Sequence, residues 1–498
     1  MKKNSAAFTL IKTLTMSEKR YFKIFSERHI IGERNKYVLL FEELDKSNTE
    51  DDKAIKNSLK KAGVHAVFLS ADRNYLYQLI LASLNGFHDS RTYNLEIKEA
   101  LLSIEILFHK GLYQECLKLI AKTETLAEEC ENFQLMIDVL MWKKRCSGYS
   151  LGLQKAAEVN LSIDKYIALL NNLKSITDLY YRSNLLQAGN EKFSKGDVLK
   201  KFERILQQPE LKNERNALSF SAKVYYHLIY SNYYRYLDNQ SKELRHLEQL
   251  VALIHQSKTY AVEYPLDYIS IYDRLLSSKK FFHSDSFFKD IEALNAFAHK
   301  AHIRKDVVQQ RVFIHTHTHE LEYYYINHRY QQGLAKTKAI EKEILKLNMD
   351  IEPYHMLYFY YLHALILTCV GEFTGALRFI NKVLNDFKPD QRPAIYLRGE
   401  MLNAIIHYEL NNYTLVTSQT KHALKKNATQ KLLSPAEEKL LKVLLKLCAS
   451  KTLTYKIENA LLQALLAETK AAPDNAMQFA DKWIAARLKR KTVSDLFV

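Results

Sequence analysis

The chain has 498 residues, a formal net charge of +16 and a composition that is 47% hydrophobic, which excludes a disordered chain. It contains only 12 glycines and 7 prolines, well below the usual shares of roughly 7% and 5%, so residues that form turns are scarce. Its apolar runs are interrupted well short of the roughly 20 residues that a membrane-spanning helix needs. These features predict an all-α protein of long helices and no membrane span.

The first residues and the cysteines indicate the cellular compartment. Lys12 interrupts the only apolar stretch near the N-terminus, so the opening reads as mature protein and not as a signal peptide. The five cysteines are an odd number, widely spread, and contain no C-x-x-C pair. Free, buried thiols are typical of a reducing compartment. We therefore expect a cytoplasmic protein.

Residues 1–92 are predicted to form an N-terminal helical cap. Thr15 and Glu18 have the spacing of a capping box, and further helical segments follow without a repeat signature. This opening resembles that of helical-repeat proteins of Bacteroidota, a resemblance that implies no activity. Helices at 54–61 and 71–86 also fit a DNA-reading helix-turn-helix, but their connector exceeds the three or four residues of that motif. We favour a capping bundle, with nucleic-acid contact as the alternative.

Residues 93–430 contain helix pairs, and the clearest lies in YFYYLHALILTCVGEFTGALRFINKVLNDFKPD. Its first helix is predicted to end at Gly371 and its second to begin near Phe373. Small residues at Ala364 and Ala376 allow the two backbones to approach closely, and Pro389 ends the unit. This order of aromatic, small, large apolar and proline positions resembles a tetratricopeptide repeat.

Weaker copies of the same pattern contain Tyr113, Tyr330 and Tyr413. The fold predicted for residues 93–430 is therefore an α-solenoid of tetratricopeptide-like helix pairs. Residues 431–498 are predicted to add C-terminal capping helices with a basic tail. Ser434 and Glu437 supply a second capping box at the start of that segment.

The stretch FIHTHTHELEYYY, residues 313–325, places three histidines and two glutamates on one predicted helix. His315, His319 and Glu322 lie at i, i+4 and i+7 on one face, while His317 turns toward the packing side. Two histidines one turn apart and a carboxylate can bind zinc. The stretch lacks the second histidine of H-E-x-x-H, however, and the sequence predicts neither a further ligand nor supporting residues. We expect no metal ion and no cofactor here.

The resemblance to tetratricopeptide arrays implies that the first helix of each pair lines a concave groove. Tyrosine and charged side chains there suit recognition of a protein or peptide. The residues expected to line this groove are His315, Thr318, His319, Glu322, Tyr325, Tyr358, Tyr361 and Arg398.

About half of the positive surplus lies in residues 421–498. The last predicted helix packs Trp483 and Ile484 on the solenoid and carries the densest basic cluster of the chain. That cluster consists of Arg487, Lys489, Arg490 and Lys491. It fits the negative end of a helix dipole, and it also fits contact with nucleic acid or another acidic partner.

Motifs of enzymes are absent from the sequence, because it contains no G-x-G-x-x-G, G-x-x-x-x-G-K-[ST] or G-x-S-x-G. We therefore expect no catalytic residues. The hypothesis is a non-enzymatic interaction scaffold or adaptor that binds a protein or peptide in its groove. The alternative is a nucleic-acid-associated regulator that contacts DNA or RNA through the N-terminal helices or the basic C-terminus.

Overall fold

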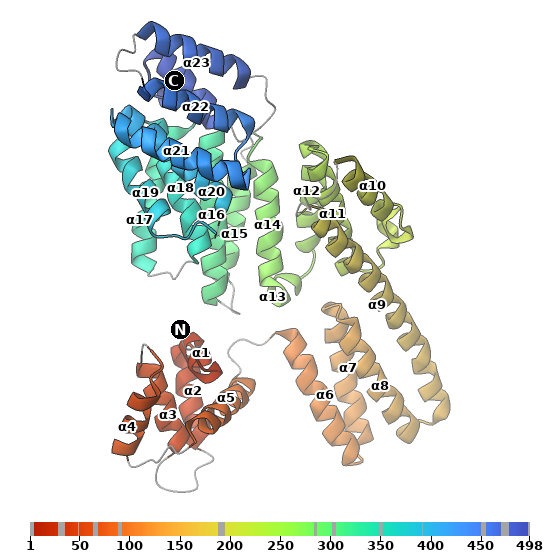
Figure 1. Cartoon of the computed structure of the whole chain (residues 1–498). Coiled ribbons are helices and arrows are strands. Elements are labelled where there is room, and N and C mark those ends of the chain that lie inside the picture. Colours follow the sequence, from red (N-terminus) through yellow and green to blue (C-terminus); the bar gives the residue numbers. More distant parts are fainter. Residues whose placement is uncertain are drawn as a thin grey trace. The chain divides into compact units, whose positions relative to one another are not determined.

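A computed structural model describes residues 4–27, 35–47, 49–62, 68–87, 92–187, 195–282, 286–300, 305–347, 352–390, 392–449, 455–469 and 478–496. These residues form helices and connecting segments, and none of them forms a β-strand. The all-α prediction is therefore confirmed. The chain divides into two compact units, Met1–Glu96 and Ile97–Val498 (Figure 1). The finer predicted division at residues 92/93 and 430/431 stays a prediction.

The first unit is a small helical bundle with its own core. Its helices are α1 (Ala6–Thr13), α2 (Met16–Glu27), α3 (Lys36–Lys46), α4 (Asp52–Lys61) and α5 (Leu69–Gly86). The rings of Phe22 and Phe41 stack at 4.5 Å in this core, and both are fully buried. Thr15 and Glu18 form the predicted capping box, in which each backbone N–H donates to the other side chain. The connector of the proposed helix-turn-helix includes residues 63–67, which lie outside the described residues.

The second unit begins inside α6 and continues as a succession of helices, which Figure 1 shows in chain order. They are α6 (Tyr93–His109), α7 (Tyr113–Glu129), α8 (Phe133–Ser150), α9 (Leu153–Gln187), α10 (Lys195–Leu206), α11 (Phe220–Tyr236), α12 (Gln240–Ile254), α13 (Tyr260–Glu263), α14 (Pro265–Lys279), α15 (Ser286–Lys300), α16 (Lys305–Ile326), α17 (Tyr330–Leu347), α18 (Pro353–Cys369), α19 (Phe373–Asn385), α20 (Pro393–Glu409), α21 (Tyr413–Gln430), α22 (Pro435–Ala449), α23 (Tyr455–Thr469) and α24 (Gln478–Lys489). The predicted repeat markers Tyr113, Tyr330, Phe373 and Tyr413 each open the second helix of a pair.

The turns inside these pairs share one backbone geometry. A single residue has a positive φ in each, for example Gly371 (+83°) between α18 and α19, and Asn411 (+60°) between α20 and α21. The next N–H then bonds back to a carbonyl five residues earlier, as from Glu372 to Leu367 at 2.9 Å. This is a Schellman turn, which ends one helix and starts the next within three residues. Its recurrence identifies a structural repeat even where the sequence signature is weak.

The predicted repeat core is confirmed at its clearest unit. Ala364 of α18 and Ala376 of α19 are both fully buried in one continuous apolar cluster. Ile380 and Val383, one and two turns after Ala376, are also fully buried. This periodicity fixes which face of α19 packs against the array.

Stacked first helices form the layer that positions the site. Helix α9 packs on α11, α14 on α16, α16 on α18, α18 on α20 and α20 on α22. We call these seven helices the first-helix layer. Such stacking of alternate helices is the defining contact of a helical solenoid. In the described part of the chain, no helix is long and apolar enough to cross a membrane.

Candidate functional site

Polar side chains link successive helices of the first-helix layer. Asn232 of α11 donates to Oδ1 of Asn184 on α9 at 2.7 Å. Arg274 of α14 donates to Oδ1 of Asn232 at 2.8 Å. Further along, the Tyr358 hydroxyl of α18 donates to Oε1 of Glu322 on α16 at 2.6 Å. The layer is therefore joined by polar contacts as well as by apolar packing.

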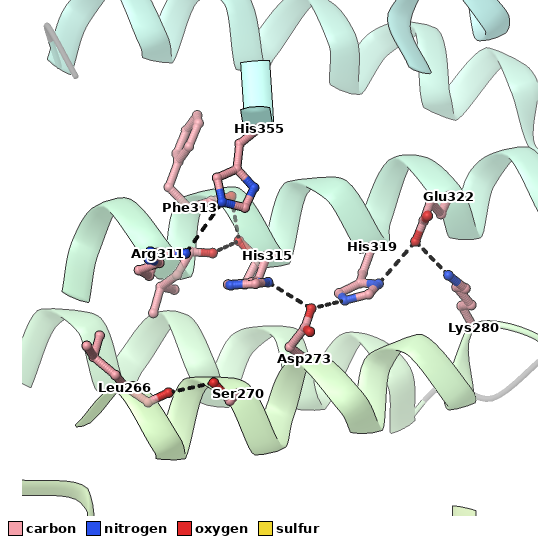
Figure 2. A network of polar contacts seen from close by, with 12 residues as sticks. Leu266, Ser270, Asp273, Lys280, Arg311, Phe313, His315, His319, Glu322 and His355 are labelled. Atoms are coloured by element: carbon pink, nitrogen blue, oxygen red, sulfur yellow. Dashed lines mark hydrogen bonds and ion pairs between the residues drawn. The ribbon is translucent and has the colours of Figure 1, made fainter. Parts of the chain in front are cut away.

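Where α14 contacts α16, several of these polar side chains lie together (Figure 2). We call the five residues Asp273, Lys280, His315, His319 and Glu322 the histidine network. Oδ1 of Asp273 accepts from Nδ1 of His315 and from Nε2 of His319, both at 2.7 Å. Nδ1 of His319 lies 3.2 Å from Oε2 of Glu322. Nζ of Lys280 lies 2.7 Å from the same Glu322 oxygen. The carboxylates of Asp273 and Glu322 thus contact one lysine and two imidazole rings.

Electrostatics bind the histidine network together. Burial by itself would raise the pKa of Asp273, but hydrogen bonds from His315 and His319 outweigh it and hold that pKa well below its usual range. Burial also favours a raised pKa for Glu322, yet Lys280 and His319 lower it. Burial lowers the pKa of His319, whereas its two carboxylate partners raise it, and the net shift is upward. Both ring nitrogens of His319 face carboxylates, so with protons alone the ring is an imidazolium.

The structure brings five of the eight predicted groove residues into one neighbourhood. His315, His319 and Glu322 belong to the histidine network. Tyr358 extends it through Glu322, and the ring of Tyr361 stacks on that of Tyr358 at 6.3 Å. Burial raises the pKa of Tyr361 to about 12 although its side chain keeps partial solvent access.

The other three predicted groove residues border this neighbourhood, and two of them, Tyr325 and Arg398, lie close enough to Tyr361 to interact with it electrostatically. Thr318 is partly exposed on α16. Lys482 of α24 lies 4.9 Å above the ring of Tyr325, so the C-terminal helix covers that tyrosine. Arg398 of α20 pairs with the fully buried Glu437 of α22 at 2.8 Å. Tyr325 and Arg398 therefore help to hold the helices together.

His317 takes the packing position predicted for it. It is buried, its ring meets that of Phe313 edge-on at 4.5 Å, and its Nδ1 lies 2.9 Å from Glu320. The i, i+4 spacing thus separated the two network histidines correctly from the one between them.

A second feature, which sequence reasoning missed, is a cavity of about 390 Å³ between α9, α11, α13 and α14. Five tyrosines line this cavity, which we call the tyrosine-lined cavity: Tyr180, Tyr181, Tyr225, Tyr260 and Tyr264. Arg274 contributes a guanidinium, and Glu131 and Asp267 contribute carboxylates. Burial raises the pKa of Tyr225 to about 12, so its hydroxyl is a neutral donor and acceptor at pH 7. Tyr181 is 61% exposed, which leaves the cavity open to solvent.

The local sequence explains how the cavity wall is fixed. Glu131 occupies the left-handed position, φ +49°, of the turn between α7 and α8. Its carboxylate accepts from the backbone N–H groups of Phe220 and Ser221 at 2.8 and 2.7 Å. An acidic group at the N-terminus of α11 also complements the helix dipole. This contact ties the turn to a helix about 90 residues further along the chain.

The predicted basic cluster is only partly available for contacts. Trp483 and Ile484 pack into the core as predicted, and Trp483 donates to Glu409 at 2.7 Å. Arg487 also bonds to Glu409, at 3.1 Å, and lies 5.2 Å from the ring of Tyr408. Arg487 is therefore part of the contact that fixes α24. Lys489, Arg490 and Lys491 are exposed at the end of that helix.

Comparison with known proteins adds little to this picture. No protein-family model and no curated protein matches the chain. Among solved structures, it is similar to a Signal Transduction ATPase with Numerous Domains (STAND) protein with a tetratricopeptide repeat sensor from Pyrococcus horikoshii. The identity is 12%, the TM-score is 0.33, and the match covers 88% of this chain but only 56% of that one. A likeness at this TM-score carries no argument about function.

Proposed function

We propose that this chain is a non-enzymatic scaffold that binds a protein partner through the first-helix layer, with a peptide segment of the partner in the tyrosine-lined cavity. The observation that supports this proposal is the composition of the cavity wall. Five tyrosines, one guanidinium and two carboxylates surround about 390 Å³ of open space. That volume falls within the roughly 300–1,000 Å³ of ordinary ligand sites.

The wall chemistry suits a peptide. Tyrosine offers a large apolar surface with a polar end, which loses little side-chain entropy on binding and is enriched at the centres of interfaces. Arg274 is already oriented by Asn232, so it presents a fixed donor to a carboxylate or a backbone carbonyl. Asp267 adds an acceptor for backbone N–H groups. A helical solenoid supplies the extended surface along which the rest of a partner can bind.

A cytoplasmic location remains a prediction.

Site-specific photo-crosslinking tests this function. We expect a photo-crosslinking amino acid in place of Tyr181, at the open side of the cavity, to capture a protein partner in native cells. Tyr149 of α8 is 71% exposed and lies outside the cavity, so the same replacement there is the matched control. The Tyr181 adduct should be a protein band that resists nuclease, and the Tyr149 position should not give that band.

The outcomes separate the two classes of function. Identical adducts from both positions, or none from Tyr181, would contradict a peptide site in the cavity. Adducts that nuclease removes, and that disappear when Lys489, Arg490 and Lys491 are neutralised, would support the nucleic-acid alternative instead. Those three exposed residues are the specific observation that keeps this alternative in view.

A further inference from the structure

We propose that Asp273, His315 and His319 bind one divalent transition-metal ion of the zinc class, and that Glu322 orients His319 for this role. This inference is independent of the proposed peptide site and goes beyond it. The three potential ligand atoms all lie within 4.8 Å of one another. Two imidazole nitrogens and one carboxylate oxygen are the donor set of many zinc and non-haem iron sites.

The spacing within the set suits an ion after a small adjustment. Oδ1 of Asp273 lies 2.7 Å from Nδ1 of His315 and 2.7 Å from Nε2 of His319. Ligands of a tetrahedral ion with bonds of about 2.0–2.1 Å stand about 3.3 Å apart, so the rings need to move outward by about 0.6 Å. The ion would take the place of the protons that now lie between the carboxylate and the rings: His319 would release its Nε2 proton to solvent, and a neutral His315 would carry its single proton on Nε2 and bind through Nδ1.

Glu322 supplies the supporting contact that metal-binding histidines usually have. A ligating imidazole commonly donates its second N–H to a carboxylate, which fixes the ring and raises its basicity. His319 has this arrangement, since its Nε2 faces Asp273 and its Nδ1 faces Glu322. Glu322 is itself held by Lys280 and by the Tyr358 hydroxyl. Its oxygens are therefore engaged, and it acts as a positioning residue and not as a fourth ligand.

The cluster also offers an entry path for an ion. The side chain of Asp273 is 37% exposed and that of His315 is 20% exposed, while that of His319 is only 7% exposed. An ion could thus arrive from solvent at Asp273 and His315 and settle against a fixed third ligand. Three protein ligands leave a fourth coordination position for water or for a group of a bound partner.

These contacts supply the two features of a metal site that the sequence did not predict, a further ligand and a supporting residue. The further ligand is Asp273, which precedes His315 by 42 residues and lies on another helix. The missing supporting contact is Glu322, which the sequence had placed on the same face as the carboxylate of the candidate zinc set. The two histidines at i and i+4 therefore belong to a cluster that also contains a third potential ligand, Asp273, and a supporting carboxylate, Glu322.

Metal titration of the full chain tests the proposal. Protein stripped with a chelator and dialysed should bind one equivalent of Zn²⁺ in calorimetry, and one equivalent of Co²⁺ should give the visible absorption of a low-symmetry site. Asp273→Asn and His315→Gln should each abolish the stoichiometric step. Glu322→Gln should weaken affinity about 10- to 100-fold without changing the stoichiometry. His422→Ala, on the 69% exposed His422 of α21, is the matched control and should bind as the wild type does.

Two results would overturn the metal site. One is a wild-type chain that shows no saturable binding of Zn²⁺ at micromolar concentration. The other is a correctly folded His315→Gln variant that keeps the full equivalent, since the ion would then lie elsewhere among the 18 histidines of the chain. His315→Gln decides the question even if Asp273→Asn fails to fold, because the His315 ring lies at the partly exposed edge of the cluster.

Discussion

Ala376→Arg should lower the free energy of unfolding of the repeat array by at least about 3 kcal/mol, because it forces a long cation into a space fitted to one methyl group. Ala376 is fully buried, and its neighbours on the same face of α19, Phe379 and Ile380, are buried as well. The side chain cannot reach water without separating α19 from the array. Circular dichroism during a thermal melt gives the measurement.

Thr374→Arg is the matched control for this change. Thr374 lies two residues earlier on α19 but is exposed, so the same cation is added to the same helix on its solvent side. The control should melt close to the wild type. Equal melting temperatures for Ala376→Arg and the wild type would place Ala376 outside the core and would refute the register of the repeats.

Glu322→Ala should be the most damaging single change in the histidine network, with a loss of about 3–5 kcal/mol. It leaves Lys280, whose side chain is only 11% exposed, without its carboxylate partner. It also removes an acceptor from the Tyr358 hydroxyl and from His319. A buried charge that loses its partner costs more than the intact pair contributed. Chemical denaturation of the full chain measures the loss.

Two further variants show whether burial is the cause. Glu322→Gln keeps an oxygen acceptor and should lose less than Glu322→Ala. Glu341→Ala removes a carboxylate from an ion pair with Arg378, a residue whose side chain is 61% exposed, and should cost less than about 1 kcal/mol. If Glu322→Ala costs no more than Glu341→Ala, the histidine network does not stabilise the contact of α16 with its neighbours.

The sequence predicted the local features of this protein well. Helix starts at Tyr330, Phe373 and Tyr413 follow from aromatic and small residues at repeat spacing. The box of Ser434 and Glu437 depends on residues three apart, and both of its hydrogen bonds are present. In each case the residues that determine the structure lie within one or two helical turns, so their pattern is visible in a single stretch of sequence.

The parts that the sequence did not predict depend on contacts between distant helices. Asp273 meets His315 only because α14 and α16 pack with a particular rotation about their axes, which no local pattern encodes. Arg487 was expected to be free for contacts, but Glu409, 78 residues earlier, holds it. The cavity arises from four separate segments. None of the residues that line it is among those that the sequence predicted for the groove.

The most direct test of the central claim, a protein-binding site on the first-helix layer, is hydrogen–deuterium exchange of the full chain with and without its crosslinked partner. Peptides from α11, from α14 and from residues 260–264 border the cavity and should exchange more slowly in the complex. Exchange in α19 and α21, the second helices of their pairs, should not change. Protection confined to the end of α24, or spread over the second helices alone, would contradict the account.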